Sequence, residues 1–384
     1  MRLAYILPRY GSEVLGGAER LAQGAIERLA QRGHDIEVWT TCARDTYTWI
    51  NEHPVGLEQV NGIRVRRFPV QPHQPYDIFA ELLTPESQYK WVSHLAHSPQ
   101  LYRYIEAHGP AFDFLVFIPY IVGMTYCGAR IHPQRSIVWA CLHNELAAYL
   151  APTRRVLANA AGIIFNTVAE QALMVNKLGI KHPRTVVTGM GFDLPAGDGT
   201  TFRQKYPQIG RQFFIYAGRL EPDKNVDLLF QYFSRYRSRH NHPLDLVLLG
   251  NGPLNNGKKI PGIIPLGFVD EVTKRNALAA ATFLCQPSSN ESFSIVLMES
   301  WTQGRPVLVH ERCAVTIEHV RQAQGGLYFA NYNDFEGAVE YLLTQPDQAD
   351  QMGANGRAYV RQNYNWPVII DRLEQALLRW LEES

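Results

Sequence analysis

The sequence predicts an α/β protein with two doubly wound domains and a C-terminal helix. The chain has 384 residues, which is more than one ordinary hydrophobic core holds. Short apolar runs of strand type alternate with amphipathic helical segments, a pattern typical of parallel sheets. The alternation stops at the glycine-rich stretch "GMGFDLPAGDGT" (189–200) and then begins again, so this stretch reads as a linker. We therefore expect domains at residues 1–192 and 193–364, followed by a helix at 365–384.

The first domain opens with one βαβ unit. Residues 2–7 ("RLAYIL") read as a buried strand, and 35–41 ("DIEVWTT") read as the next strand. Between them, residues 18–34 carry apolar side chains at helical spacing and end at a glycine, which indicates an amphipathic helix. Further strands are predicted at 112–118, 136–142, 162–166 and 184–190.

The second domain repeats the pattern. Helices are predicted at 225–236, at 271–281, after Glu291, and from Phe335 to the end with a break near "NYNWP". Strands are predicted at 212–220, 244–253, 263–270, 282–288 and 305–310. Ligands of such sheets bind beyond the carboxyl ends of the strands, so we expect a binding site in the cleft between the domains.

Composition excludes several classes of protein. Apolar residues make up 46% and charged residues 19%, as in an ordinary globular protein, and the net charge of +1 gives no bulk attraction to nucleic acid. The apolar run at the N-terminus ends at Pro8, too short for a signal peptide, and no run reaches the ~18 apolar residues of a membrane span. We expect a cytoplasmic protein. Peripheral contact with the inner face of a membrane and the oligomeric state stay open.

Neither a disulfide framework nor a metal site is expected. The five cysteines are odd in number and form no C-x-x-C pair, so they read as buried, reduced thiols. The chain has no D-x-D motif and no paired Cys/His spacing. We therefore expect chemistry without a metal and without another cofactor.

Two stretches could bind phosphate. Gly16 and Gly17 precede the first helix, whose N–H groups and dipole favour an anion, although a plain βα loop explains them equally well. Arg219 and Lys224 follow the first strand of the second domain, five residues apart. Two such cations on one loop fit a diphosphate, and the alternative is a solvated loop with ordinary charges.

The stretch "NESFSIVLMESW" (290–301) places two acids around the start of a helix. Glu291 lies before the helix and Glu299 more than one turn inside it, so the two are too far apart to act on one atom. Hydroxyl groups of one polyol ligand could engage both. Alternatively, Glu299 pairs with a buried cation such as Arg305. The first N–H groups of the helix, at Phe293, Ser294 and Ile295, are expected to face the same cleft.

Weaker candidates come from the ends of other strands. His143 follows a strand of the first domain on the side where that sheet binds ligands, although a lone histidine there is more often structural. Other strand-end turns could bring backbone close to a ligand, or could be plain turns; they contain Gly250, Gly252, Phe268 and Val269.

Taken in order, these motifs resemble retaining glycosyltransferases of family four, which have the GT-B fold and use nucleotide-activated sugars. The resemblance covers nearly the whole chain and is most specific at the two glutamates of the 290–301 stretch. It is carried by "GGAERL", "LHNE", "VVTGMGFD", "YAGRLEPDKNVDLLF", "LLGNGPL", "LGFV" and "ESFSIVLMESWTQGRPVL". The sequence departs from the family's usual "EGFG", because Ser292 and Ser294 stand in place of two glycines.

The resemblance implies a role for each motif. Arg219 and Lys224 would hold the donor diphosphate, while Glu299 would bind the ribose hydroxyls and Glu291 would lie near the transferred sugar. His143 would lie near the reacting sugar. The remaining implied contacts are with sugar or phosphate through backbone: the 293–295 amides, and the loop that contains Gly16 and Gly17.

The function implied is transfer of a hexose from a nucleotide sugar to a hydroxyl of a saccharide or lipid-linked glycan, with retention of configuration. UDP-glucose is the expected donor, and polysaccharide or glycolipid synthesis the expected context. The final helix would pack back on the first, acceptor-binding domain, and the second domain would bind the donor. Aromatic side chains of the 44–110 region could stack on the acceptor or pack on their own helices.

Three other functions stay open. A nucleotide-sugar epimerase shares the GT-B architecture and would act without an acceptor. A catalytically silent subunit would bind the donor without transferring it. A nicotinamide-dependent dehydrogenase fits least well, because the glycine pattern of dinucleotide binding is missing at the first βα turn.

Overall fold

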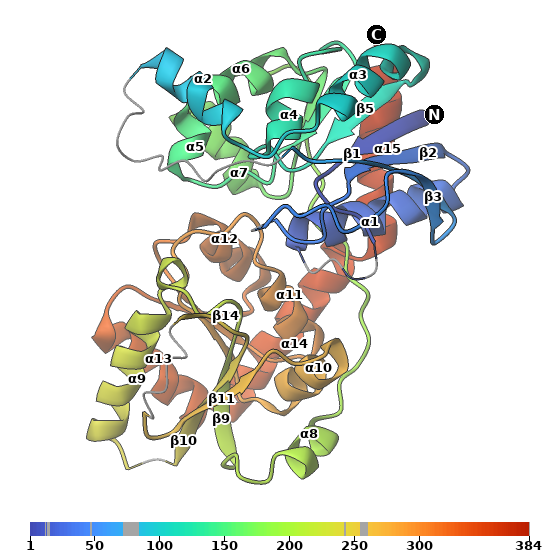
Figure 1. The fold of residues 1–384 in the computed structure, drawn as a ribbon. Helices are drawn as coiled ribbons and strands as arrows, with labels where there is room; N and C mark the ends of the chain where they lie inside the picture. Colours follow the sequence, from blue (N-terminus) through green and yellow to red (C-terminus); the bar gives the residue numbers. More distant parts are fainter. Residues whose placement is uncertain are drawn as a thin grey trace. The chain divides into compact units, whose positions relative to one another are not determined.

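The computed structural model describes residues 1–383 apart from 12, 14, 15, 47, 72–83, 242 and 254–259. The chain forms two compact units, one of residues 1–191 and 366–384 and the other of residues 192–365 (Figure 1). The fold is that of two α/β units with largely parallel sheets, which confirms the predicted class. Part of the aromatic stretch expected to contact an acceptor, residues 72–83, lies outside the described residues.

Unit 1 contains an eight-stranded sheet in the order β3-β4-β2-β1-β5-β6-β7-β8. The strands are parallel except for β3, which pairs antiparallel with β4. Their bounds are β1 (Arg2–Ile6), β2 (Asp35–Thr41), β3 (Gly56–Val60), β4 (Ile63–Phe68), β5 (Phe114–Phe117), β6 (Ser136–Trp139), β7 (Gly162–Phe165) and β8 (Thr185–Val187).

The hairpin of β3 and β4 is absent from the sequence prediction. Its turn is Asn61–Gly62, and both residues have positive φ, at 51° and 79°. Asn-Gly between two strand-like runs is the strongest local sign of a tight hairpin, so the signal was present in the sequence.

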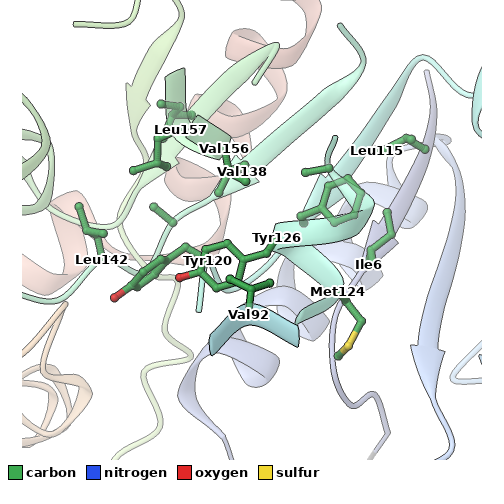
Figure 2. Close-up of a cluster of buried hydrophobic side chains, with 14 of the residues drawn as sticks. Ile6, Val92, Leu115, Tyr120, Met124, Tyr126, Val138, Leu142, Val156 and Leu157 are labelled. Carbon is green, nitrogen blue, oxygen red and sulfur yellow. The ribbon is translucent and has the colours of Figure 1, made fainter. Parts of the chain in front are cut away.

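The helices of unit 1 cover a sheet buried on both faces. They are α1 (Gly17–Gln31), α2 (Pro85–Ser93), α3 (Pro99–His108), α4 (Gly123–Gly128), α5 (Leu146–Tyr149), α6 (Ala151–Asn159), α7 (Val168–Ala172) and α15 (Trp366–Glu382). Figure 2 shows part of the core on one face, a cluster that contains Ile6, Leu115 and Val138 of the central strands together with Val156 and Leu157 of α6. Central strands with four consecutive buried residues are what a sheet covered on both faces requires.

Helix α15 returns the end of the chain to unit 1. The indole of Trp366 fills the space beside Gly24 of α1, where an added Cβ would lie 2.1 Å from the ring. Trp380 packs in the same way on Gly162 of β7, at 2.6 Å from an added Cβ. Two tryptophans thus insert against two glycines, and the guanidinium of Arg28 stacks 4.3 Å from the Trp366 ring.

Unit 2 contains a six-stranded sheet in the order β11-β10-β9-β12-β13-β14, with every pairing parallel. The strands are β9 (Gln212–Ala217), β10 (Leu244–Leu249), β11 (Ile263–Gly267), β12 (Leu284–Gln286), β13 (Val307–His310) and β14 (Gly326–Phe329). The sequence prediction missed β14. The helices are α8 (Gly199–Lys205), α9 (Val226–Arg239), α10 (Glu271–Ala280), α11 (Ile295–Thr302), α12 (Ala314–Ala323), α13 (Tyr332–Thr344) and α14 (Pro346–Asn363).

The core of unit 2 lies between the sheet and these helices. Helices α9 and α13 lie side by side and bury their apolar faces with residues of β9 and β10 (Figure 1). The predicted C-terminal helix is divided in the structure at Gln345–Pro346 and again near Asn365, giving α13, α14 and α15. A proline in the first turn of a helix marks its start, which explains the first break.

Candidate active site

The order of strands in unit 2 indicates where a ligand is expected to bind. From β9 the chain builds outward to β10 and β11, then returns to the other side of β9 and builds β12, β13 and β14. The switch point lies between β9 and β12, and the adjacent carboxyl ends of such strands leave a crevice for a ligand. The loops 218–225 and 287–294 begin at these two ends. They carry five of the predicted residues: Arg219, Lys224, Glu291, Phe293 and Ser294.

Lys224 and Glu291 form an ion pair across the switch point. The Nζ atom of Lys224 lies 3.1 Å from Oε1 of Glu291, and the two side chains are only 16% and 13% exposed. Gln286, at the end of β12, donates from Nε2 to the same carboxylate oxygen at 3.5 Å. The structure therefore brings together two predicted residues that lie 67 positions apart in the chain.

Arg219 lies on the same loop as Lys224 and is half-exposed. Its Nη1 atom lies 2.7 Å from a carboxylate oxygen of Glu221. Its backbone is held in place by a hydrogen bond, because the hydroxyl of buried Tyr216 donates to the Arg219 carbonyl at 2.6 Å. Gly218 has φ of 157° at this bend. The loop thus presents two cations, each with a carboxylate partner.

Glu299 lies in α11 and pairs with a lysine that the sequence analysis did not name. Nζ of Lys274, from α10, lies 2.6 Å from Oε1 of Glu299 and 3.0 Å from a carboxylate oxygen of Glu271. Burial acts to lower the pKa of Lys274, yet these two carboxylates raise it above its ordinary value. Arg305, the suggested partner, instead donates to the carbonyl of Ala279 at 2.7 and 3.0 Å.

The residues before α11 differ in their surroundings. Ile295 is the first residue of α11, and Ser294 is its N-cap with φ of 67°, a conformation that favours glycine. Phe293 is buried with its ring stacked 5.9 Å from Phe192 and edge-on to Tyr364 at 5.2 Å. The phenyl ring therefore anchors the loop, while the N-terminus of α11 lies at the switch point.

Gly250 and Gly252 have a packing role in the structure. A Cβ on Gly250 would lie 2.0 Å from the carbonyl oxygen of Gly218, and one on Gly252 would lie 2.3 Å from that of Leu220. The loops after β9 and β10 are therefore pressed together backbone to backbone, which only glycine allows. Of the two residues expected near a base, Phe268 is 63% exposed and Val269 is half-buried.

Unit 1 has its own switch point, between β1 and β5. Gly16 is the N-cap of α1, and Gly17 is the first residue of that helix, directly after the β1 loop. A Cβ on Gly16 would lie 2.0 Å from a carboxylate oxygen of Glu19, so an acidic side chain already lies beside this helix N-terminus. Arg9 neutralises it, donating from Nε and Nη2 to Oε1 of Glu19 at 3.0 and 2.7 Å.

The sequence did not reveal the Arg9–Glu19 pair, because this pair forms only when the loop after β1 folds back over α1. The quoted motif "GGAERL" contains Glu19, but Arg9 lies ten residues earlier. The pair is largely buried, with the side chains 15% and 9% exposed. A carboxylate and its counterion therefore lie beside Gly16 and Gly17, where the sequence predicted an anion site.

His143 follows β6 in unit 1 and is half-buried. The turn around it is fixed by Glu145, whose N–H donates to the His143 carbonyl at 2.9 Å. The hydroxyl of Tyr120, after β5, donates to Oε1 of Glu145 at 2.6 Å. Burial and the Glu145 carboxylate both raise the pKa of Tyr120, so this hydroxyl stays protonated.

A second buried acid lies behind this turn. Glu170 accepts from the N–H of Asn166 at 2.7 Å and from the N–H of Leu142, the residue before His143. Burial raises the pKa of Glu170 to about 8 against these hydrogen bonds. Its sequence context gave no sign of this, because burial of a helical carboxylate depends on the strands packed over it.

The structure also describes the cysteines, the apolar character of the helices and the grouping of possible metal ligands. All five cysteines are free thiols, and all except half-buried Cys127 are buried. Among the described residues, no helix is both long and apolar enough to cross a bilayer. Within the same part of the chain, no three His, Cys, Asp or Glu side chains are grouped to hold a metal ion.

Comparisons with known proteins agree with this architecture. Residues 16–191 match the glycosyl transferase 4-like domain, and residues 199–359 match glycosyl transferases group 1. The D-inositol 3-phosphate glycosyltransferase of Rhodococcus erythropolis is 24% identical over 386 residues, covering 91% of this chain and 83% of the relative.

Solved structures share the fold. Sucrose-phosphate synthase from Thermosynechococcus elongatus has a TM-score of 0.73 at 18% identity and covers 100% of both chains. The Anabaena protein HepE, solved in complex with UDP, has a TM-score of 0.74 at 16% identity and covers 99% of this chain and 100% of that one. The chain belongs to the family-four glycosyltransferases and has the GT-B fold. It is therefore a glycosyltransferase.

Proposed function

We propose that this glycosyltransferase moves a hexose from a UDP-sugar, such as UDP-glucose, to a hydroxyl of a saccharide or lipid-linked glycan, with retention of configuration. The observation that carries the proposal is the Lys224–Glu291 pair at the switch point of unit 2, with Arg219 on the same loop. Two cations and an acid on the loops of one switch point are the groups that a diphosphate with an attached sugar requires, which supports the proposal.

In this proposal, each candidate site residue discussed next has a part in donor binding. Arg219 and Lys224 hold the diphosphate, and the N-terminus of α11 adds N–H groups and the positive end of its dipole. Glu291 accepts hydrogen bonds from the transferred sugar, and Glu299 from the ribose hydroxyls. Lys274, 2.6 Å from Glu299, orients this second carboxylate, whose oxygens act as hydrogen-bond acceptors.

The chemical step breaks the bond between the anomeric carbon and the diphosphate oxygen. Arg219, Lys224 and the α11 N-terminus stabilise the charge that develops on the leaving group, and no metal is needed in this scheme. The acceptor hydroxyl attacks from the face that the diphosphate leaves, forming the new C–O bond. Its proton passes to the departing phosphate oxygen. No protein nucleophile is assigned, and His143 supports the reacting sugar.

The relatives support both substrate classes. HepE has been solved with UDP and with UDP-glucose, which favours a uridine nucleotide as donor here. The D-inositol 3-phosphate glycosyltransferases act on a polyol, which favours an acceptor with several hydroxyl groups. A second solved neighbour, WaaG, takes part in lipopolysaccharide biosynthesis, which favours synthesis of a glycolipid or polysaccharide.

Thermal unfolding with added nucleotides tests donor binding. UDP, GDP, ADP, UDP-glucose and NAD are each added in the presence of EDTA, and a ligand at 100 times its Kd stabilises the native state by about 2.7 kcal/mol. A shift with UDP and UDP-glucose despite EDTA is the expected result. A shift only when Mg²⁺ or Mn²⁺ replaces EDTA would contradict metal independence.

Product analysis tests the reaction. NMR of the product with a saccharide acceptor should show the donor's anomeric configuration, and an inverted product would contradict retention. A new sugar nucleotide formed without acceptor would favour the epimerase alternative. Donor binding with neither product, across a panel of acceptors, would favour the silent subunit.

A further inference from the structure

Ser294 is an unusual residue for its position. It is the N-cap of α11 with φ of 67°, a region that glycine enters freely and that strains a residue with a Cβ. The residue is only 6% exposed, so solvent does not relieve the strain. A glycine at position 294 would adopt the same backbone without steric strain, yet the chain carries a serine.

The hydroxyl of Ser294 adds a second cost. Its Oγ atom is buried and has no hydrogen-bond partner in the part of the chain that the structure describes. A buried hydroxyl without a partner loses its hydrogen bonds to water and gains none in return. Neither the backbone angle nor the packing of unit 2 therefore explains this side chain, whereas a bound ligand that accepts a hydrogen bond would.

The surroundings indicate what that ligand is. Ser294 follows Glu291 by three residues, which puts their Cα atoms within about 11 Å of each other. It also caps the helix whose N-terminal N–H groups favour an anion. At the same connection, Oε1 of Gln286 is also buried without a partner, while its Nε2 donates to Glu291. Two unpaired polar atoms therefore belong to the connection that carries Glu291.

We propose that the Ser294 hydroxyl donates a hydrogen bond to a phosphate oxygen of the nucleoside diphosphate, so that this residue binds the donor through its side chain as well as its backbone. The inference rests on the proposed function, because the diphosphate is part of the proposed donor. The proposed hydrogen bond explains why a serine stands where the family usually has a glycine. When the donor binds, this bond offsets both the backbone strain and the burial of the unpaired hydroxyl.

Two substitutions test the proposal. Ser294→Ala removes the hydroxyl and keeps the Cβ, whereas Ser294→Gly removes both. The Kd of each variant is measured by calorimetry for UDP and for UDP-glucose, with GDP or ADP used instead if the unchanged protein binds one of those better. We expect both variants to bind the nucleoside diphosphate about 10- to 100-fold more weakly, the range for a hydrogen bond to a charged group. Ser238→Ala is the control, because that exposed hydroxyl already donates to the Arg235 carbonyl.

Stability without nucleotide separates this role from a structural one. Ser294→Ala should unfold at the same temperature as the unchanged protein or higher, and Ser294→Gly about 2–4 °C higher because the backbone strain is relieved. A Ser294→Ala variant that unfolds at a lower temperature would show that the hydroxyl stabilises the fold, which overturns the proposal.

The binding data distinguish two kinds of failure. If the unchanged protein binds UDP but Ser294→Ala binds it equally well, the proposed function stands and the role of Ser294 falls. A loss seen with UDP-glucose but not with UDP would also overturn the assignment to the diphosphate, because the contact would then be with the sugar. If the unchanged protein binds no nucleotide, both the donor assignment and the inference fail.

Discussion

Removal of the Lys224 amine should reveal two separate effects, one on stability and one on catalysis. In Lys224→Met the carboxylate of Glu291 loses a cation 3.1 Å away while it stays largely buried. Breaking a buried pair in this way costs about 3–5 kcal/mol, and the slight exposure of both side chains favours the lower end. For a unit of this size, about 3 kcal/mol lowers the unfolding temperature by roughly 6–12 °C.

A double-mutant cycle isolates the pair. In Lys224→Met/Glu291→Gln no charge is left unpaired, so most of the lost stability should return, with a coupling energy of about 2 kcal/mol or more. Arg239→Met is the control, because its pair with Glu336 is exposed on the Arg239 side and should contribute less than about 1 kcal/mol. The free energies of unfolding are read from denaturant titrations that follow unit 2.

The double variant also separates fold from function. It should be nearly as stable as the unchanged protein and yet transfer no sugar, because the diphosphate has lost a cation and the sugar a carboxylate. Single-substitution effects that add to within about 0.5 kcal/mol would refute the pairing across the switch point. Full transfer activity in a stable double variant would refute the assignment of the donor site.

Three further predictions concern stability. Because the pKa of Glu170 is raised to about 8, unit 1 should lose stability by up to ~1.4 kcal/mol per pH unit as pH rises from about 4.5 to 8, and Glu170→Gln should remove this slope in denaturant titrations. Burial lowers the pKa of His319 to about 3, so unit 2 should lose stability as pH falls from about 6.5 toward 3; a His319→Leu variant with the same acid slope would contradict this. Gly24→Ala should destabilise unit 1 by about 1–3 kcal/mol in calorimetry, because the new Cβ meets Trp366, although helix propensity alone predicts a gain.

The order of elements was largely readable from the sequence. Strands such as 35–41 and 212–217 are short apolar runs bounded by turn residues, and a run of this kind is a local property. The predicted strand at 35–41 coincides with β2. Of the missed strands, β3 and β14 have mostly exposed or half-buried residues, whose hydrophobic signal is weaker. The β4 strand is mostly buried, but three arginines interrupt its apolar run.

The site was only partly readable, because its partners come from distant parts of the chain. The sequence singled out Arg219, Lys224, Glu291 and Glu299 as candidates and gave a physical reason for each residue type. It did not show that Lys224 pairs with Glu291, nor that Glu299 pairs with Lys274. Ion pairs between elements depend on the order of strands in the sheet, and that order cannot be read from the periodicity and motifs of a single sequence.

What the sequence by itself determined is most of the strands and helices in order, the alternation of strand and helix in two domains, and the kinds of groups that could bind a nucleotide sugar. Those features follow from periodicity, turn residues and motif spacing, which act over a few residues. The tertiary structure alone decided that Arg9 forms an ion pair with Glu19 and that Glu170 is buried. It also decided that the hydroxyl of Ser294 has no hydrogen-bond partner among the described residues. Burial and pairing depend on which residues are close in three dimensions, and they arise only when residues far apart in the chain pack together and exclude water.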